Sequence, residues 1–219
     1  MKIILATNNQ HKRRELEAIL ETHEVTTPRD LGIDFDHEET GATFLANAMG
    51  KAVALFKVLQ KQQGASNLGV GQQAVVIADD SGLCVDALAG APGIYSARYG
   101  SPDGGKTELD AAARNLLLLE SLAGSNPRTA HFVCSMVALW TLDRFSVAQE
   151  VWNGAITAEP SAAKGGFGYD PVFFIPELGC TAAELSETDK NQYSHRGRAA
   201  RVLAGSINAA LDLTIPGKG

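Results

Sequence analysis

Two adjacent carboxylates, Asp79 and Asp80, follow the apolar run 74–78, and Ser81 and Gly82 come directly after them. The apolar run predicts a buried strand, and the serine and glycine predict a tight turn at its end. Carboxylates that leave a strand of an open α/β sheet face a crevice, where they can hold a divalent cation or orient a water molecule. The alternative is a turn whose side chains cap backbone N–H groups, so other parts of the sequence must decide.

A polar stretch near the N-terminus suggests a site for phosphate. Residues 7–12 read Thr-Asn-Asn-Gln-His-Lys and lie between a predicted strand over 3–6 and a predicted helix over 10–20. Free N–H groups and the helix dipole favour an anion there, and Lys12 adds a positive charge, so a triphosphate would fit. An N-capped turn with a solvated lysine explains the same residues equally well. Because the glycines of a P-loop are missing, Walker-type binding is not indicated.

A second helix, predicted over 43–60, carries further polar side chains. Glu39 precedes it and could reach a metal shared with Asp80, or could simply stabilise the first turn of the helix. Asn47 and Lys51 are four residues apart and therefore lie on one helix face. That face could point toward the carboxylates, or Lys51 could be solvated.

Two later segments have the composition of a base-binding site. Segment 164–171 holds three glycines around Phe167 and Tyr169, which could stack on a nucleobase or anchor a turn in the core. His195 and Arg196 begin a predicted helix, against the dipole preference for acids in a first turn, which indicates that they bind something else. The guanidinium of Arg196 offers fixed donors for carbonyl or phosphate oxygens.

Composition limits the class of protein. The chain has 219 residues, of which 45% are hydrophobic and 20% charged, enough for a substantial core. The net charge of −6 disfavours binding to nucleic acid or to an anionic membrane. Three widely spaced cysteines predict neither a disulfide framework nor a zinc site. The apolar stretch 3–6 is too short for a signal peptide, and no later stretch is long enough to span a membrane, so we expect a cytoplasmic protein.

The remaining periodicities predict the architecture. Apolar and β-branched runs predict strands over 130–142 and 145–156, joined as a hairpin, and another over 171–175. Helical spacing recurs over 107–122 and 194–211, while 61–73 and 87–105 look irregular. We therefore expect one domain over 1–219, an α/β fold in which helices flank a mixed sheet, with two lobes and a central cleft.

Six motifs occur in a fixed order along the chain: Thr7-Asn8-Asn9 with Lys12, Glu38-Glu39-Thr40-Gly41, Ala78-Asp79-Asp80-Ser81-Gly82-Leu83, Gly90-Ala91-Pro92-Gly93-Ile94-Tyr95-Ser96-Ala97-Arg98-Tyr99, Gly165-Gly166-Phe167-Gly168-Tyr169-Asp170-Pro171 and Ser194-His195-Arg196-Gly197. Together they resemble the Ham1/inosine triphosphate pyrophosphatase family, and within it the bacterial dITP/XTP pyrophosphatases. The resemblance covers almost the whole chain.

The resemblance implies an elongated Maf/Ham1-like fold, a homodimer, and Mg²⁺-dependent hydrolysis of non-standard purine nucleoside triphosphates (ITP, dITP, XTP) to the monophosphate and pyrophosphate. It implies that Asp80 is the general base and that Glu39 and Asp80 bind the metal. We expect the neighbouring Asp79 either to orient the water in place of Asp80 or to hold Asp80 in position. The substrate contacts that it implies are Thr7, Asn8, Asn9, Gln10, His11, Lys12, Lys51, Ser81, Phe167, Gly168, Tyr169, Asp170, Lys190, His195 and Arg196. Many relatives have glycine where this chain has Asn8, and often a small residue near His11.

Two rival functions stay open at this point. A Maf-like pyrophosphatase would act on modified pyrimidine or other nucleotides, without the paired Gly-Phe-Gly-Tyr-Asp and Ser-His-Arg-Gly motifs. A non-catalytic nucleotide sensor would use the same residues without turnover, although the two carboxylates favour an enzyme. An Asp-nucleophile phosphatase is disfavoured because it would need Asp-x-Asp, whereas these acids are adjacent.

Overall fold

The strands of the computed structural model, which describes residues 1–62, 74–103 and 109–212, form one mixed sheet with the order β2-β1-β3-β4-β5-β6-β7. Strand β1 pairs in parallel with β2 and β3, whereas β6 pairs in antiparallel fashion with β5 and β7. The mixed sheet predicted from the sequence is therefore confirmed. The strands are β1 (Lys2–Leu5), β2 (Glu24–Thr26), β3 (Ala74–Val85), β4 (Thr129–Thr141), β5 (Arg144–Ile156), β6 (Phe173–Ile175) and β7 (Cys180–Thr181).

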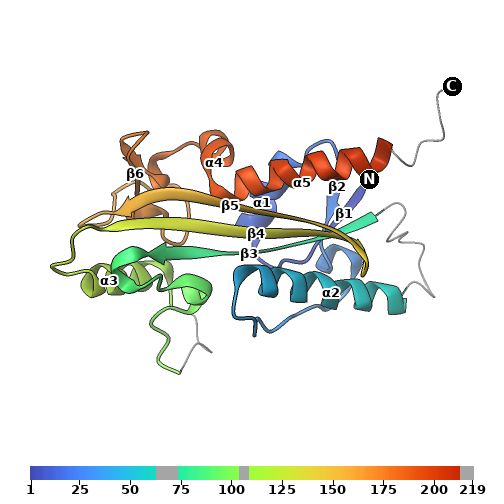
Figure 1. Ribbon diagram of the computed structural model, residues 1–219, viewed down its shortest axis with the longest axis horizontal. Coiled ribbons are helices and arrows are strands. Elements are labelled where there is room, and N and C mark those ends of the chain that lie inside the picture. Colours follow the sequence, from blue (N-terminus) through green and yellow to red (C-terminus); the bar gives the residue numbers. More distant parts are fainter. Residues whose placement is uncertain (63–73, 104–108, 213–219) are drawn as a thin grey trace. The chain divides into compact units, whose positions relative to one another are not determined.

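Helices flank the sheet, as expected for an α/β fold (Figure 1). The α-helices are α1 (Gln10–Ile19), α2 (Phe44–Gln62), α3 (Ala111–Ser121), α4 (Glu187–Tyr193) and α5 (His195–Asp212). Short 3-10 helices are η1 (Arg29–Leu31), η2 (Asp86–Leu88), η3 (Gly93–Arg98), η4 (Asp170–Val172) and η5 (Ala182–Glu184).

The described residues divide into two compact units. Unit 1 comprises 1–62, 74–80, 134–150 and 197–212, and unit 2 comprises 81–103, 109–133 and 151–196. The single domain over 1–219 and the central cleft stay predictions.

Unit 1 buries side chains on both faces of its strands. Because side chains alternate along a strand, Val75 and Ile77 of β3 pack with α1 and α5, while Val76 and Ala78 pack with α2. Figure 1 shows α2 and α5 on opposite sides of these strands. Neighbouring residues of β3 are thus aimed at different helices, which decides where its carboxylates point.

Unit 2 has its own hydrophobic core. Leu83 from β3, Leu118 from α3 and Phe173 from β6 are fully buried there. The ring of Phe132 packs at 4.6 Å from that of Phe173 and at 6.5 Å from that of Trp152, measured between centroids. Aromatic packing therefore supports the strands that precede and follow the predicted base-binding segment.

The structure corrects the predicted turn after Asp80. Strand β3 runs without a break from Ala74 to Val85, so Asp79, Asp80, Ser81 and Gly82 lie inside a 12-residue strand. The Ser-Gly pair is a local turn signal, but β3 is flanked by β1 and β4 in the sheet, and pairing with neighbours decides the conformation.

Other element boundaries also differ from the sequence predictions. Helix α3 begins only at Ala111, where the side chain of Asp110 caps it, and of the strand predicted over 171–175 only 173–175 is extended. The short elements β2, β7 and α4 were not predicted, and the irregular segment 87–105 contains η3. Of the loop predicted over 61–73, residues 61 and 62 belong to α2 and the rest lies outside the described residues.

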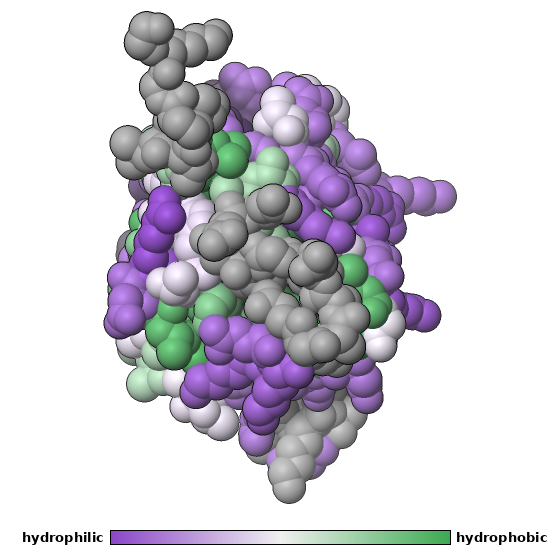
Figure 2. Space-filling model, turned by 90° about the vertical axis from the view of Figure 1, so that its right-hand side faces the viewer, coloured by the Kyte–Doolittle hydropathy of each residue, from purple (hydrophilic) through white to green (hydrophobic). Residues whose placement is uncertain are grey.

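Among the described residues, no helix combines the length and the apolar character that crossing a bilayer requires. On the face drawn in Figure 2, hydrophilic residues predominate and the visible hydrophobic ones form small separate groups.

Candidate active site

The two adjacent carboxylates point to opposite faces of β3. Asp79 Oδ2 lies 2.9 Å from Nζ of Lys12 in α1, whereas Asp80 Oδ2 accepts a hydrogen bond of 2.9 Å from Nδ2 of Asn47 in α2. Both carboxylates are almost fully buried, with 3% and 5% of their residue surfaces exposed. Each acid thus has a partner on a different helix, Asp79 on α1 and Asp80 on α2, and the expected help of Asp79 to Asp80 stays a prediction.

Asp80 is a buried carboxylate with a perturbed pKa. Its pKa is raised from 3.8 to about 6, mainly by burial and then by the negative charge of Glu39, while the hydrogen bond from Asn47 and the charges of Lys12 and Lys51 oppose the shift. Near neutral pH the group is mostly ionised, yet its affinity for a proton is well above that of a solvated aspartate. Such a group can accept a proton from water or bind a cation.

Lys51 bridges Glu39 and β3. Its Nζ forms an ion pair with Glu39 Oε1 and donates a hydrogen bond of 3.2 Å to the backbone carbonyl of Asp79. Burial lowers the pKa of Lys51, but the charges of Asp79 and Glu39 outweigh it and the pKa is raised overall. The helix face predicted to carry Asn47 and Lys51 thus points at the carboxylates. We refer to Lys12, Glu39, Asn47, Lys51, Asp79 and Asp80 as the carboxylate–lysine cluster.

The phosphate loop, residues 7–12, is an N-capped helix start. Asn9 Oδ1 accepts hydrogen bonds from the backbone N–H groups of His11 (2.9 Å) and Lys12 (3.2 Å), and Thr7 Oγ1 accepts one of 3.1 Å from the N–H of Asn9. Gln10 begins α1 and is exposed, as are the side chains of Asn9 and His11. An anion would have to compete with Asn9 for these N–H groups. Their role in phosphate binding stays a prediction.

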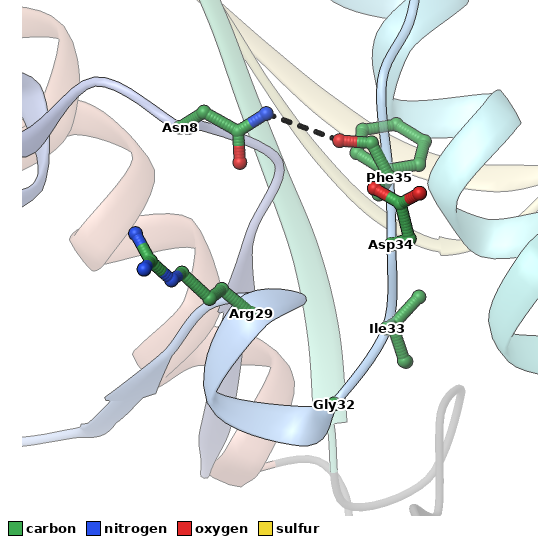
Figure 3. A pocket seen from close by; sticks show the side chains of 6 residues that line it. All are labelled: Asn8, Arg29, Gly32, Ile33, Asp34 and Phe35. Carbon is green, nitrogen blue, oxygen red and sulfur yellow. Dashed lines mark hydrogen bonds between the residues drawn. The ribbon is translucent and has the colours of Figure 1, made fainter.

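Asn8 ties the phosphate loop to the segment that leads to Glu39. Its Nδ2 donates a hydrogen bond of 3.1 Å to the carbonyl of Phe35. Figure 3 shows this bond at the rim of a cavity of about 330 Å³, lined by Asn8, Arg29, Gly32, Ile33, Asp34 and Phe35. A glycine at position 8 could not form this link.

The predicted base-binding residues form a second group, in unit 2. The aromatic loop, residues 165–170, closes on itself through Asp170, whose Oδ2 accepts hydrogen bonds from Phe167 N (2.6 Å) and Lys190 Nζ (2.5 Å). Gly166 has φ +71° and a side chain there would collide with Asp170, so the turn requires glycine. Asp170 and Lys190 are 4% and 7% exposed, a buried ion pair that fixes the loop.

Positive charges surround the ring of Phe167. Lys190 Nζ lies 4.2 Å and the Arg196 guanidinium carbon 5.6 Å from its centroid. Arg196 also donates a hydrogen bond of 2.8 Å from Nη2 to Ser81 Oγ, which connects the start of α5 to β3. The structure thus brings together Ser81, Phe167 and Arg196, which belong to three separate motifs of the sequence, and adds Lys190, which lies outside the motifs.

His195 is part of the aromatic core of unit 2. Its ring stacks on Phe132 with centroids 4.7 Å apart and an interplanar angle of 3°, and it lies 6.3 Å from the ring of Trp152. Only 5% of the residue is exposed. The contact with nucleotide implied for His195 stays a prediction.

Glu39 and Asp80 are the candidate ligands of a divalent cation in the carboxylate–lysine cluster, and their binding of a metal stays a prediction. Among the residues that the structure describes, no group of three His, Cys, Asp or Glu side chains could hold a metal ion. Glu39 and Asp80 nevertheless interact closely enough for the charge of one to raise the pKa of the other. Mg²⁺ in nucleotide-processing sites is commonly held by one or two carboxylates together with substrate phosphates. Two acids with mutual repulsion meet that requirement.

Sequence comparison identifies the family. The model of the Ham1 family matches residues 3–205. The chain belongs to the Ham1 family. A curated dITP/XTP pyrophosphatase of Treponema denticola is 48% identical over 199 residues, which covers 91% of this chain and 94% of that protein. The dITP/XTP pyrophosphatase of Escherichia coli K12 is 42% identical over 213 residues, covering 94% and 98%.

Solved structures agree with the Ham1 assignment. The Staphylococcus aureus Ham1 protein is 37% identical and superimposes with a TM-score of 0.78, covering 96% of this chain and 100% of that chain. A Ham1 protein from Coxiella burnetii, 34% identical, gives a TM-score of 0.76 with coverages of 95% and 99%. The Ham1-like α/β fold expected from the sequence is therefore confirmed.

Proposed function

We propose that this chain is a pyrophosphatase that hydrolyses ITP, dITP and XTP to the nucleoside monophosphate and pyrophosphate. The observation that carries the proposal is the near-full-length match to curated dITP/XTP pyrophosphatases. The carboxylate–lysine cluster supports it, because it combines carboxylates and lysines in one buried group, the residue types that hydrolysis of a triphosphate requires.

In the proposed reaction, a water molecule attacks the α-phosphorus while Asp80 accepts one of its protons. The new bond joins the water oxygen to the α-phosphorus, and the bond between that phosphorus and the α–β bridging oxygen breaks. Asp80 suits the role because it is ionised at neutral pH but, with a pKa of about 6, is more basic than a solvated aspartate. The hydrogen bond from Asn47 fixes the orientation of its carboxylate.

We propose that Lys12 and Lys51 bind phosphate oxygens and that Asp79 is a positioning residue. Both lysines are largely buried, with 16% and 14% of their side chains exposed, so their charges act with little screening by water. The ion pair with Asp79 restrains the ammonium of Lys12. Thr7 to Lys12 would contribute backbone and side-chain donors to the same phosphates.

Glu39 and Asp80 would hold Mg²⁺, whose charge, when bound, would neutralise the pyrophosphate leaving group. In the structure Glu39 is paired with Lys51. We infer that Lys51 exchanges Glu39 for a phosphate oxygen when substrate binds. As in the family it resembles, the protein would act as a homodimer.

The base would bind at the aromatic loop of unit 2. Phe167 offers a ring for stacking, and Arg196 offers donors that pair with O6 of hypoxanthine or xanthine and oppose the amino group of adenine. A buried donor left unpaired makes the wrong base unfavourable by about 1 to 3 kcal/mol. Ser81, Gly168, Tyr169, Asp170, Lys190 and His195 would shape or support this site.

A substrate panel tests the proposal. Pyrophosphate release is measured with ITP, dITP, XTP, GTP, ATP and modified pyrimidine nucleotides, each with Mg²⁺ and with EDTA. We expect Mg²⁺-dependent release that is fastest with the three non-standard purines. Equal rates for ITP and ATP would reject the selectivity, preference for a modified pyrimidine would favour the Maf-like alternative, and binding without release would indicate a sensor.

A further inference from the structure

The segment 90–99 was conspicuous in the sequence, yet the proposed reaction gives it no role. In the structure its central residue, Ser96, is 8% exposed and connects two elements of unit 2. Ser96 Oγ accepts a hydrogen bond of 2.8 Å from Leu83 N in β3 and donates one of 2.6 Å to the carbonyl of Gly93. The hydroxyl therefore fixes η3 against β3, three residues after Asp80.

Tyr169 of the aromatic loop binds to the same residue. Its hydroxyl donates a hydrogen bond of 2.8 Å to the backbone carbonyl of Ser96, across 73 positions of sequence. The residue is 4% exposed. Burial raises the pKa of the phenol, so the hydroxyl keeps its proton and remains a donor at any physiological pH. Because both groups are buried, loss of the donor would leave the carbonyl without a substitute from water.

Helix α3 donates hydrogen bonds to both the aromatic loop and η3. Asn115 Nδ2 donates a hydrogen bond of 3.1 Å to the carbonyl of Gly168, and the neighbouring Arg114 donates one of 2.7 Å to the carbonyl of Ala97. Asn115 is 4% exposed and lies on the buried side of a leucine-rich helix, with its Oδ1 lacking a hydrogen-bond partner among the described residues. A buried amide with an unsatisfied oxygen costs stability. The presence of Asn115 at this buried position therefore indicates that its hydrogen bond to the loop has a function.

We propose that Ser96, Asn115 and Tyr169 are positioning residues that hold the aromatic loop in the conformation required for base recognition. Ser96 bonds η3 to β3, Tyr169 bonds the loop to η3, and Asn115 bonds α3 to the loop. The bond from Arg114 joins α3 to η3, so that η3, α3 and the loop are each bonded to the other two. A loop ordered before the nucleotide arrives loses less conformational entropy on binding, so the contacts should act mainly on substrate affinity. The expected effect on substrate affinity rests on the proposed function. The ordering of the loop by these contacts does not depend on it.

The structural part is tested by hydrogen exchange of the free protein. Tyr169→Phe removes one hydroxyl, and we expect the amides of 165–170 to exchange about tenfold faster, a factor equivalent to about 1.4 kcal/mol. Tyr99→Phe is the matched control, because it removes a tyrosine hydroxyl of the same unit that donates a hydrogen bond of 3.2 Å to the exposed Ser121 Oγ. Asn115→Leu should accelerate exchange in the same peptide as Tyr169→Phe.

The functional part is tested by steady-state kinetics with ITP. We expect Tyr169→Phe and Asn115→Leu each to raise KM about tenfold and to change kcat by less than about twofold. Inhibition by inorganic tripolyphosphate, which lacks a base, should stay unchanged. Tyr99→Phe should match the wild type throughout.

Two results would overturn the inference: unchanged exchange in the loop of both variants, or acceleration spread over all of unit 2 with a uniform loss of kcat. The second would show a merely structural role. If the wild type does not turn over ITP at all, the proposed function fails, and exchange in the loop still decides whether these residues position it.

Discussion

Replacing Asp80 by asparagine should abolish turnover and at the same time stabilise the metal-free protein. The carboxylate is 5% exposed, and its pKa rises from 3.8 to about 6 on folding. The folded protein therefore binds more protons than the unfolded chain between these values, and stability falls as the pH rises through them. Asparagine has nearly the same size, carries no charge, and its Oδ1 can still accept the hydrogen bond from Asn47.

The size of the effect follows from the shift. A difference of about two pKa units lowers the free energy of unfolding by about 3 kcal/mol. This loss of stability is fully present above about pH 8 and nearly absent near pH 4. For a protein of this size, about 1 kcal/mol shifts Tm by roughly 2 to 4 °C, so the expected gain at about pH 8 is roughly 6 to 12 °C.

Thermal unfolding of both proteins in EDTA, at about pH 4 and about pH 8, measures this difference. Asp34→Asn is the matched control, because it neutralises an exposed carboxylate of the same unit. Mg²⁺ should raise Tm of the wild type and leave Asp80→Asn unchanged. Equal stability of the two proteins at high pH, or a gain that does not grow with pH, would refute the argument that Asp80 is held in an unfavourable environment.

Three further predictions concern other residues. Glu39→Gln should lower the pKa of Asp80 in the protein kept in EDTA, because the charge of Glu39 raises that pKa, and Lys51→Met should raise it, as an NMR titration of the carboxyl group measures. Asn8→Ala removes the amide that ties the phosphate loop to the segment before Glu39, so KM for ITP should rise about fivefold, the effect of about 1 kcal/mol, with kcat unchanged. Burial lowers the pKa of His23, whose ring nitrogens are buried without hydrogen-bond partners among the described residues. The unfolded chain then binds the extra proton, stability falls below about pH 6.5, and His23→Phe should remove that loss in denaturant titrations at successive pH values, whereas a parallel decline in both proteins would contradict it.

The elements that local pattern specifies were predicted well. Helix α1 and the β4–β5 hairpin lie within one or two residues of their predicted ranges, because apolar spacing and β-branched runs are properties of the segments themselves. The short strands β2 and β7 have no such pattern and exist through pairing with β1 and β6. The turn expected after Asp80 failed for the same reason, since sheet pairing outweighed a local Ser-Gly signal.

The sequence indicated which residues could form the candidate site, but not which of them contact one another. Adjacent carboxylates suggested a shared task, yet strand alternation sends Asp79 to Lys12 and Asp80 to Asn47. A contact such as that between Tyr169 and the carbonyl of Ser96 spans 73 positions and depends on a backbone atom, which every residue possesses. Asn115 was missed as well, although an amide directly before four leucines of a helix is a signal that could have found it.

Hydrolysis of ITP in ¹⁸O-labelled water, with the products separated and weighed, tests the central proposal most directly. Attack at the α-phosphorus predicts one labelled oxygen in inosine monophosphate and none in pyrophosphate. Label in pyrophosphate, or release of inosine diphosphate and orthophosphate, would contradict the assignment of Asp80 as the group that accepts a proton from water at the α-phosphorus.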